Sequence, residues 1–458
     1  MDPAEAIHAK FAAAVGGGRL PRRLAALAPE EVGLTAETLV ELYHSQCVSR
    51  QMDRLSRRLQ ARGEGFYTIG SSGHENNAAV AEAFRVDDIA FLHYRSAAFQ
   101  IHRAKRVPGQ TPNWDMMLSF VASAEDPISG GRHKVIGSRA LAIPPQTSTI
   151  ASHLPKAMGT AFSIGLARTL KLDGTPLPSD SVVLCSFGDA SANHSTAQGA
   201  INAAGWAAWQ GSPMPIVFLC EDNGIGISVP TPKGWIEANL RGRAGLEYIS
   251  CNGLDMVDPY RGAAEAARFA RRERRPVFLH MECVRLYGHA GSDVQTSYLT
   301  KQQIEQCEDC DPLLHSAALL VEQGILAPKD ALEIYDEAEA TLARLAEEAI
   351  KRPRLTSAET VMASIVPPGR ERLPANTPSP EQREALFARH RAFMDKPQHM
   401  ARLLSWALAD LMLDHPEIIV AGEDVGRKGG VYNVTSRLQE RFGPARVIDT
   451  LLDEQSIL

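Results

Sequence analysis

The chain of 458 residues is 44% hydrophobic and 22% charged, and its formal net charge is −6. This balance is typical of a soluble globular protein that is long enough for two or three domains. It provides no basic surface for a nucleic-acid backbone, and no apolar run approaches the roughly 20 residues that cross a bilayer. Because the N-terminus also lacks a basic region followed by an apolar one, we expect no nucleic-acid partner, no membrane partner and a cytoplasmic location.

Helical stretches alternate with short apolar strands between residues 35 and 350. The predicted strands are VVLCSF (182–187), PIVFLC (215–220), YISC (248–251) and PVFLHMECV (276–284). Nearly continuous apolar strands separated by helices are typical of a parallel sheet that is covered on both faces. The predicted fold class is therefore α/β with a doubly wound parallel sheet, followed by two further helices over 311–351.

The composition changes between residues 352 and 390, where prolines and irregular sequence predict a linker. A second α/β unit is predicted over 391–458, with a helix at 399–414, the strand EIIVAGED, a helix ending near Phe442 and the strand ARVIDT. Two strands and two helices cannot cover both faces of a sheet. We therefore expect this second domain to be incomplete.

Polar residues follow two of the predicted strands. Gly188 and Asp189 end one strand, and Asn223 lies 34 residues beyond Asp189, at the end of the next strand. The carboxyl ends of parallel strands meet in one crevice, so a helical crossover brings both side chains together. A carboxylate, an amide oxygen and a backbone carbonyl are suitable ligands for a Mg²⁺ ion that carries a diphosphate.

This pair of strand ends resembles the thiamine-diphosphate signature. The chain resembles in particular the decarboxylating first component of 2-oxo acid dehydrogenase complexes, an alpha-type chain here joined to the start of a beta-type chain. The resemblance implies that Asp189, Asn223 and Ile225 hold Mg²⁺ and, with Gly188, bind thiamine diphosphate. The chain departs from the signature at Ala190, at Asp222 and in a spacing that is a few residues longer, but these departures remove none of the ligands.

Two further segments resemble the parts of this family that bind phosphate. FLHYRSAAFQ places Tyr94 and Arg95 after an apolar strand, where the family binds the diphosphate, and a guanidinium suits bidentate contact with phosphate oxygens. CVRLYGHAGSDVQTSY resembles the mobile phosphate-side loop and begins with Arg285. His289 matches the loop histidine that contacts phosphate and helps to direct the acyl group to the lipoyl carrier, a catalytic role.

The segment QTSTIASHLPKAMG resembles the stretch that precedes a long helix behind the cofactor. The resemblance implies that Ser148 and Ile150 contact the aminopyrimidine and support the bent cofactor. His133 and His153 are candidates for the substrate pocket, and simple loop or helix-capping roles remain equally open.

The sequence after the linker closely resembles the opening of the beta-type subunit, with its GEDVG turn and FGPARVIDT strand. In that subunit a Glu shortly after the DT pair hydrogen-bonds N1′ of the aminopyrimidine and assists proton removal from thiazolium C2. Glu454 matches that catalytic acid, whereas Glu423 is interpreted as structural.

The implied reaction is the oxidative decarboxylation of a 2-oxo acid, with transfer of the acyl group to a lipoyl domain of an acyltransferase component. A dimeric or alpha2beta2-like assembly is expected. Branched-chain 2-oxo acids and pyruvate remain open as substrates, because Tyr67 and Ser71 suit either pocket. Two alternatives also remain: an enzyme that resembles acetoin dehydrogenase, and an inactive fragment that binds only cofactor or a subunit.

Overall fold

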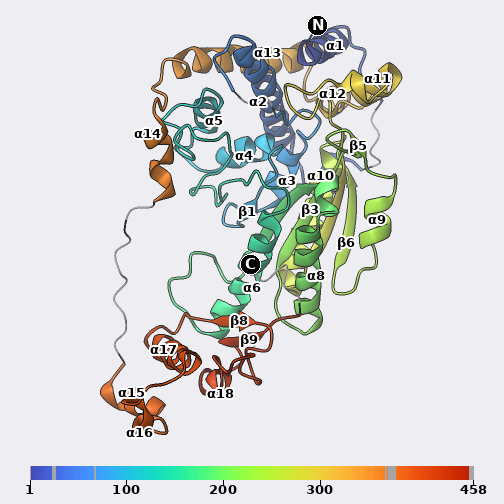
Figure 1. Ribbon diagram of the computed structural model, residues 1–458. Coiled ribbons are helices and arrows are strands. Elements are labelled where there is room, and N and C mark those ends of the chain that lie inside the picture. The colour runs from blue at the N-terminus through green and yellow to red at the C-terminus, as the bar shows by residue number, and fades with distance from the viewer. Residues whose placement is uncertain (1, 23–26, 67–68, 367–368, 370–377, 453–458) are drawn as a thin grey trace. The chain divides into compact units, whose positions relative to one another are not determined.

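The computed structural model describes residues 2–22, 27–66, 69–366, 369 and 378–452. The chain divides into two compact units (Figure 1). The first contains Met1–Ala161 and Asp180–Ile365, and the second contains Phe162–Ser179 and Val366–Leu458. Helix α6 (His153–Thr169) begins in the first unit and ends in the second.

A five-stranded sheet forms the centre of the first unit, with strand order β1-β2-β3-β7-β6 and every neighbouring pair parallel. Its strands are β1 (Ala90–Phe91), β2 (Val183–Gly188), β3 (Ile216–Asp222), β6 (Glu247–Asn252) and β7 (Val277–Glu282). The side chains of β2 are all buried, as expected for a parallel strand covered on both faces. The prediction of an α/β fold with a parallel sheet is confirmed, and the four predicted strands agree with β2, β3, β6 and β7 to within two residues.

Helices pack on this sheet and then on one another. Helix α10 (Val257–Glu273) contacts β3, β6 and β7, and α9 (Trp235–Leu240) contacts β7. Helix α3 (Asn77–Ala83) packs on α10 and on α4 (Ala97–Ala104). The other elements of this unit before the last helices are η1 (Pro29–Val32), α5 (Pro112–Phe120), α7 (Asp189–Ala192), α8 (Ser195–Trp209), β4 (Ile225–Gly226), β5 (Val229–Pro230), η2 (Gln295–Ser297) and α11 (Lys301–Asp309).

Long helices gather at one end of the first unit, at the top of Figure 1. Helix α2 (Ala36–Ala61) contacts α13 (Pro328–Ala349) and α12 (Pro312–Glu322), and α1 (Pro3–Gly16) lies against α13. The two helices predicted over 311–351 are therefore confirmed as α12 and α13. Within this group the buried guanidinium of Arg50 binds both oxygens of Asp311, at 2.7 and 2.9 Å, and one oxygen of Glu75 at 2.6 Å.

The second unit has a small core of its own, which includes Trp406, Ala409, Met412, Leu438 and Val447. Besides the end of α6, its elements are α15 (Pro380–Phe387), α16 (Arg391–Met394), α17 (Met400–Asp414), α18 (Leu438–Phe442) and a parallel pair, β8 (Val420–Gly422) and β9 (Val447–Asp449). The predicted helix at 399–414 corresponds to α17, and the two predicted strands contain β8 and β9.

Short helices form inside the stretch that was predicted to be irregular. Helix α14 (Ala358–Met362) and η3 (Ala363–Ile365) belong to the first unit, and α15 belongs to the second. Ser357 and Ser379 cap α14 and α15, and Pro380 occupies the first turn of α15, where its missing N–H breaks no helical hydrogen bond. Capping by these serines therefore stabilises short helices in a stretch whose composition predicts irregular structure. None of the helices within the described ranges is long and apolar enough to span a bilayer.

Candidate functional site

The predicted site positions follow neighbouring strands of the sheet in the first unit. Tyr94 and Arg95 come shortly after β1, Asp189 directly after β2, and Asn223 directly after β3. These parallel neighbours end at one edge of the sheet, so the side chains share that edge. Gly188 is the last residue of β2, as the sequence predicts.

Asp189 is buried at this edge, with 1% of its surface exposed. The hydroxyl of Thr231 and the backbone N–H of Asn223 donate to its carboxylate. Burial raises the pKa of Asp189, and the nearby carboxylate of Asp222 raises it further. Two acidic groups in a poorly solvated place favour a bound cation.

The amide of Asn223 is held at both ends. Its Oδ1 accepts the backbone N–H of Ile225 at 3.2 Å, and its Nδ2 lies 3.1 Å from Nε2 of His74. An amide oxygen has two lone pairs, so the contact with Ile225 leaves one for a metal. A carboxylate from Asp189, this amide oxygen and a backbone carbonyl are hard oxygen donors of the kind that Mg²⁺ binds, and the donor set fits the ion.

Ile225 lies in a tight turn that brings the backbone close to α7. It pairs with Pro230 in the β4–β5 ribbon. A Cβ built on the neighbouring Gly226 would lie 2.5 Å from the Cβ of Ala190, which is closer than real Cβ contacts. Glycine at this position therefore allows β4 to approach the helix that Asp189 begins.

Arg95 and His289 form the basic part of the site. One terminal nitrogen of Arg95 lies 3.3 Å from Nδ1 of His289 and 3.2 Å from its carbonyl oxygen, and the other donates to the carbonyl of Gly70. Burial, together with the positive charge of Arg95, lowers the pKa of His289 to about 4. Because Arg95 can only donate, Nδ1 is the acceptor and the proton of the neutral ring is on Nε2. The ring of Tyr94 meets the His289 ring edge-on, with 6.1 Å between centroids.

The loop that carries His289 is held by its own side chains. The carboxylate of Asp293 accepts the backbone N–H of His289 and the hydroxyl of Tyr298. Arg285 donates to the hydroxyl of Tyr298 at 2.9 Å and to the carbonyl of Tyr287 at 3.1 Å. Arg285 therefore stabilises the loop through hydrogen bonds to two of the loop's own residues.

A small pocket joins the remaining predicted residues of the first unit. Tyr94, Ser148 and Ile150 line it, together with His93 and His153. Ile150 is 43% exposed and offers an apolar surface at this place. The structure therefore brings the Tyr-Arg segment and the predicted aminopyrimidine segment to one cavity.

The two histidines that the sequence left open differ in environment. His133 lies near the surface, where its Nε2 contacts the hydroxyl of Ser148. His153 is buried at the start of α6, and its Nε2 lies 2.8 Å from the carbonyl of Ser186. A carbonyl only accepts, so Nε2 carries the proton and Nδ1 is an acceptor, which has no partner among the described residues.

Sequence reasoning missed three polar residues at this edge: His74, Glu221 and Thr231. Glu221 carried a signal, because a carboxylate inside the apolar strand IVFLCED is costly unless it is paired. His74 and Thr231 carried none, because their partners lie far away in the sequence. Glu454, the predicted catalytic acid, lies outside the described residues, as does Tyr67.

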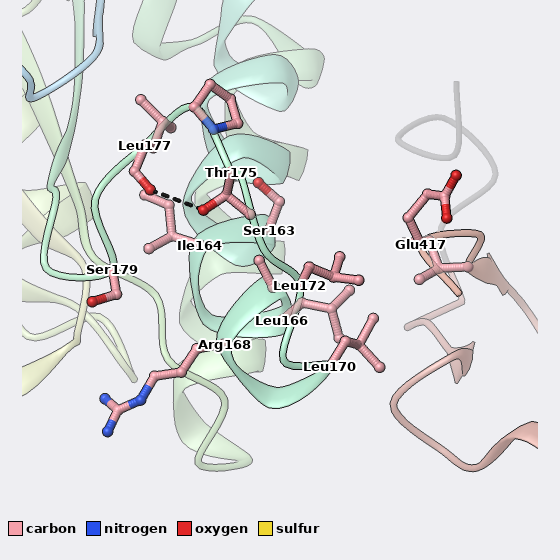
Figure 2. A pocket seen from close by; sticks show the side chains of 13 residues that line it. Ser163, Ile164, Leu166, Arg168, Leu170, Leu172, Thr175, Leu177, Ser179 and Glu417 are labelled. Atoms are coloured by element: carbon pink, nitrogen blue, oxygen red, sulfur yellow. Dashed lines mark hydrogen bonds between the residues drawn. The ribbon is translucent and has the colours of Figure 1, made fainter. Parts of the chain in front are cut away.

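A groove in the second unit does not have this chemistry. It is lined mainly by aliphatic side chains of residues 163–179, including Leu166, Leu170 and Leu172 (Figure 2). Its charged lining residues are Arg168 and Glu417, and Glu417 lies apart from the leucines in Figure 2. This lining offers no cluster of oxygen ligands for a metal with a diphosphate.

Comparison with known proteins agrees with the geometry of the first unit. A family model described as "Dehydrogenase E1 component" matches residues 43–357. The chain belongs to the dehydrogenase E1 component family. This match, together with the alpha-subunit relatives described below, confirms the predicted resemblance to the alpha-type first component. The family depends in general on thiamine diphosphate. The match includes every described site residue named above and ends before the second unit resumes at Val366.

Individual members of the E1 component family show the same relationship. The chain is 29% identical over 332 residues to the 2-oxoisovalerate dehydrogenase subunit alpha of Bacillus subtilis (strain 168). The aligned region covers 71% of this chain and 94% of that subunit. It is 25% identical over 301 residues to the mitochondrial subunit alpha of Mus musculus, and 26% identical over 295 residues to that of Caenorhabditis elegans. These matches cover 64% and 63% of this chain, and 63% of each mitochondrial protein.

Proposed function

We propose that this chain decarboxylates a 2-oxo acid with the help of thiamine diphosphate and Mg²⁺, and passes the acyl group to a lipoyl domain of an acyltransferase partner. The observation that carries the proposal is the shared strand edge of Asp189, Asn223 and Arg95. It combines oxygen donors for a divalent ion with a guanidinium for a diphosphate. Bound thiamine diphosphate supplies the electron sink for the loss of CO₂.

Different described residues would bind the metal ion and the diphosphate. Asp189, Asn223 and the carbonyl of Ile225 would hold Mg²⁺, with Gly188 beside them. Tyr94 and Arg95 would bind the diphosphate.

The neutral His289 would donate from Nε2 to a phosphate oxygen, because its Nδ1 already faces Arg95. Ser148 and Ile150 would contact the aminopyrimidine, since both line the pocket beside Tyr94. The buried His93 and His153 line the same pocket and are candidates for contact with the substrate.

Residues 391–458 are proposed to be the beginning of a beta-type domain, joined by a linker over 352–390, with Glu454 as the acid that faces the aminopyrimidine. The parallel β8–β9 pair supports an α/β unit in this region. An alpha2beta2-like assembly, or a dimer, would then bring both halves of the active site together. A cytoplasmic location stays a prediction.

Branched-chain 2-oxo acids are the first substrates to test, because the relatives named above are 2-oxoisovalerate dehydrogenase subunits. Release of CO₂ from 2-oxoisovalerate and from pyruvate should be compared with release of acetaldehyde from acetoin, which has no carboxylate, with thiamine diphosphate, Mg²⁺, a lipoyl acceptor and a beta-type subunit present. Faster turnover of acetoin than of either 2-oxo acid would favour the acetoin dehydrogenase alternative.

The cofactor assignment has its own test. D189A should abolish Mg²⁺-dependent binding of thiamine diphosphate in calorimetry, because the anionic ligand is lost. D336A, at an exposed carboxylate on α13, is the matched control and should bind normally. Unchanged affinity in D189A would refute the metal assignment.

A further inference from the structure

A chain of hydrogen bonds lies behind the amide of Asn223. Nδ2 of Asn223 lies 3.1 Å from Nε2 of His74, and Nδ1 of the same ring lies 2.7 Å from Oε2 of Glu221. The hydroxyl of Ser96 donates to Oε1 of Glu221 at 3.2 Å. His74 and Glu221 each have 0% exposed surface, so these contacts have no competition from solvent.

The donors and acceptors in this chain can be ordered. The backbone N–H of Ile225 only donates, so the atom of Asn223 that faces it is Oδ1, and the NH₂ group faces His74. Nε2 of His74 must then accept from this NH₂ group with its lone pair. The ring proton is therefore on Nδ1, where it is donated to Oε2 of Glu221.

We propose that His74 and Glu221 are positioning residues that fix the orientation of the Asn223 amide, so that its oxygen faces the Mg²⁺ site. The inference rests on the proposed function, which makes Asn223 a metal ligand. A flipped amide would place Oδ1 against the lone pair of His74 and Nδ2 against the N–H of Ile225. Both hydrogen bonds would be lost, and an NH₂ group, which has no lone pair for a cation, would face the metal.

The same side chains could be taken for a metal centre. His74, His93 and Glu221 are buried, and one potential ligand atom from each lies within 4.8 Å of the others. Both ring nitrogens of His74 and both carboxylate oxygens of Glu221 are, however, already used in hydrogen bonds. The geometry therefore favours a relay of hydrogen bonds that acts on the metal ligand Asn223.

Two variants of His74 separate orientation from packing. H74L keeps a side chain of similar bulk but removes the acceptor. H74Q can accept from Asn223 with its oxygen and donate to Glu221 with its nitrogen. With thiamine diphosphate saturating, H74L should raise the Mg²⁺ dissociation constant by about 10-fold to 100-fold, as loss of a partner behind a metal ligand typically does, whereas H74Q should stay close to the wild-type value.

A double-mutant cycle gives a readout that a packing role would not change. In the N223D background both ends of the side chain are oxygens, so orientation no longer matters. The effect of H74L on Mg²⁺ affinity should therefore largely disappear in that background. Equal effects of H74L in both backgrounds, or equal losses in H74L and H74Q, would overturn the relay.

A measurement on the wild-type protein reports the position of the His74 ring proton directly. The ¹⁵N chemical shifts of the His74 ring, assigned by comparison with H74Q, should show the proton on Nδ1, and a proton on Nε2 would overturn the proposal. If the wild type binds Mg²⁺ normally and H74L does too, the relay fails while the proposed function stands. If the wild type shows no Mg²⁺-dependent cofactor binding, the proposed function fails and the relay fails with it.

Discussion

Arg95 and His289 come from segments 194 residues apart, yet a guanidinium nitrogen of Arg95 lies 3.3 Å from Nδ1 of the His289 ring. Burial and this positive charge lower the pKa of His289 to about 4. The ring is therefore neutral at pH 7, with Nδ1 facing Arg95 and a proton on Nε2. The His289 ring therefore offers a neutral N–H donor beside the guanidinium of Arg95.

The first prediction is that R95Q raises the pKa of His289, because it removes a positive charge that disfavours protonation of the ring. Titration of the imidazole C–H resonances by NMR measures this directly. R57Q, which loses an ion pair with Asp2 near the protein surface, is the control and should leave the His289 titration unchanged. A pKa that stays near 4 in R95Q would mean that burial and the charge of Arg285 determine it without Arg95.

The second prediction concerns the buried ion cluster of Arg50, Glu75 and Asp311. D311N should lower the free energy of unfolding of the first unit by about 3–5 kcal/mol, because one partner of a buried charge is lost while the guanidinium remains. The midpoint of urea unfolding measures the change. E347Q, which weakens an exposed ion pair with Arg62, should shift the midpoint very little. A small effect of D311N would indicate that water or another group solvates Arg50.

The part of the site that sequence predicts is the part determined by local pattern. Asp189 and Asn223 were found because each directly follows an apolar strand, and the topology of parallel strands places both at one edge. The contacts of these residues were not predictable in the same way. His74 reaches Glu221 across 147 residues and Asn223 across 149, and the helix capped by Ser379 depends on one hydroxyl within a Pro-rich stretch.

The fold shows the same division. Burial of both faces gave β2 and β3 a clear apolar pattern, so their positions were predicted to within two residues. In the second unit β8 and β9 have three residues each, shorter than the apolar runs that contain them. Pairing with a neighbour, which sequence does not reveal, determines where such short strands begin and end.

The third prediction tests the apolar contact proposed for Ile150. I150A should weaken the binding of thiamine diphosphate by up to about 2 kcal/mol, at roughly 0.8 kcal/mol for each methylene group that the cofactor would cover. The requirement for Mg²⁺ should not change, because the metal ligands are intact. V361A, at an apolar residue of similar exposure outside the pocket, is the matched control for calorimetry. Wild-type affinity in I150A would remove this residue from the proposed cofactor site.

The last prediction concerns Arg446, whose guanidinium forms hydrogen bonds with backbone carbonyls of the second unit. It donates to the carbonyls of Met412, in the last turn of α17, and of His415 and Ile418, which follow that helix, at 2.7 to 3.0 Å. R446M keeps much of the apolar stem but removes every donor, leaving carbonyls that cost about 1–3 kcal/mol each if they stay buried without a partner.

R446M should therefore make residues 378–452 more sensitive to limited proteolysis, while the first unit stays resistant and still binds thiamine diphosphate with Mg²⁺. R427M serves as the control, since it removes an arginine from the same unit and leaves these carbonyl contacts intact. Mass spectrometry of the digest locates the cleavage sites. If cleavage in R446M spreads equally through both units, they unfold together, and the second unit is not an independent domain.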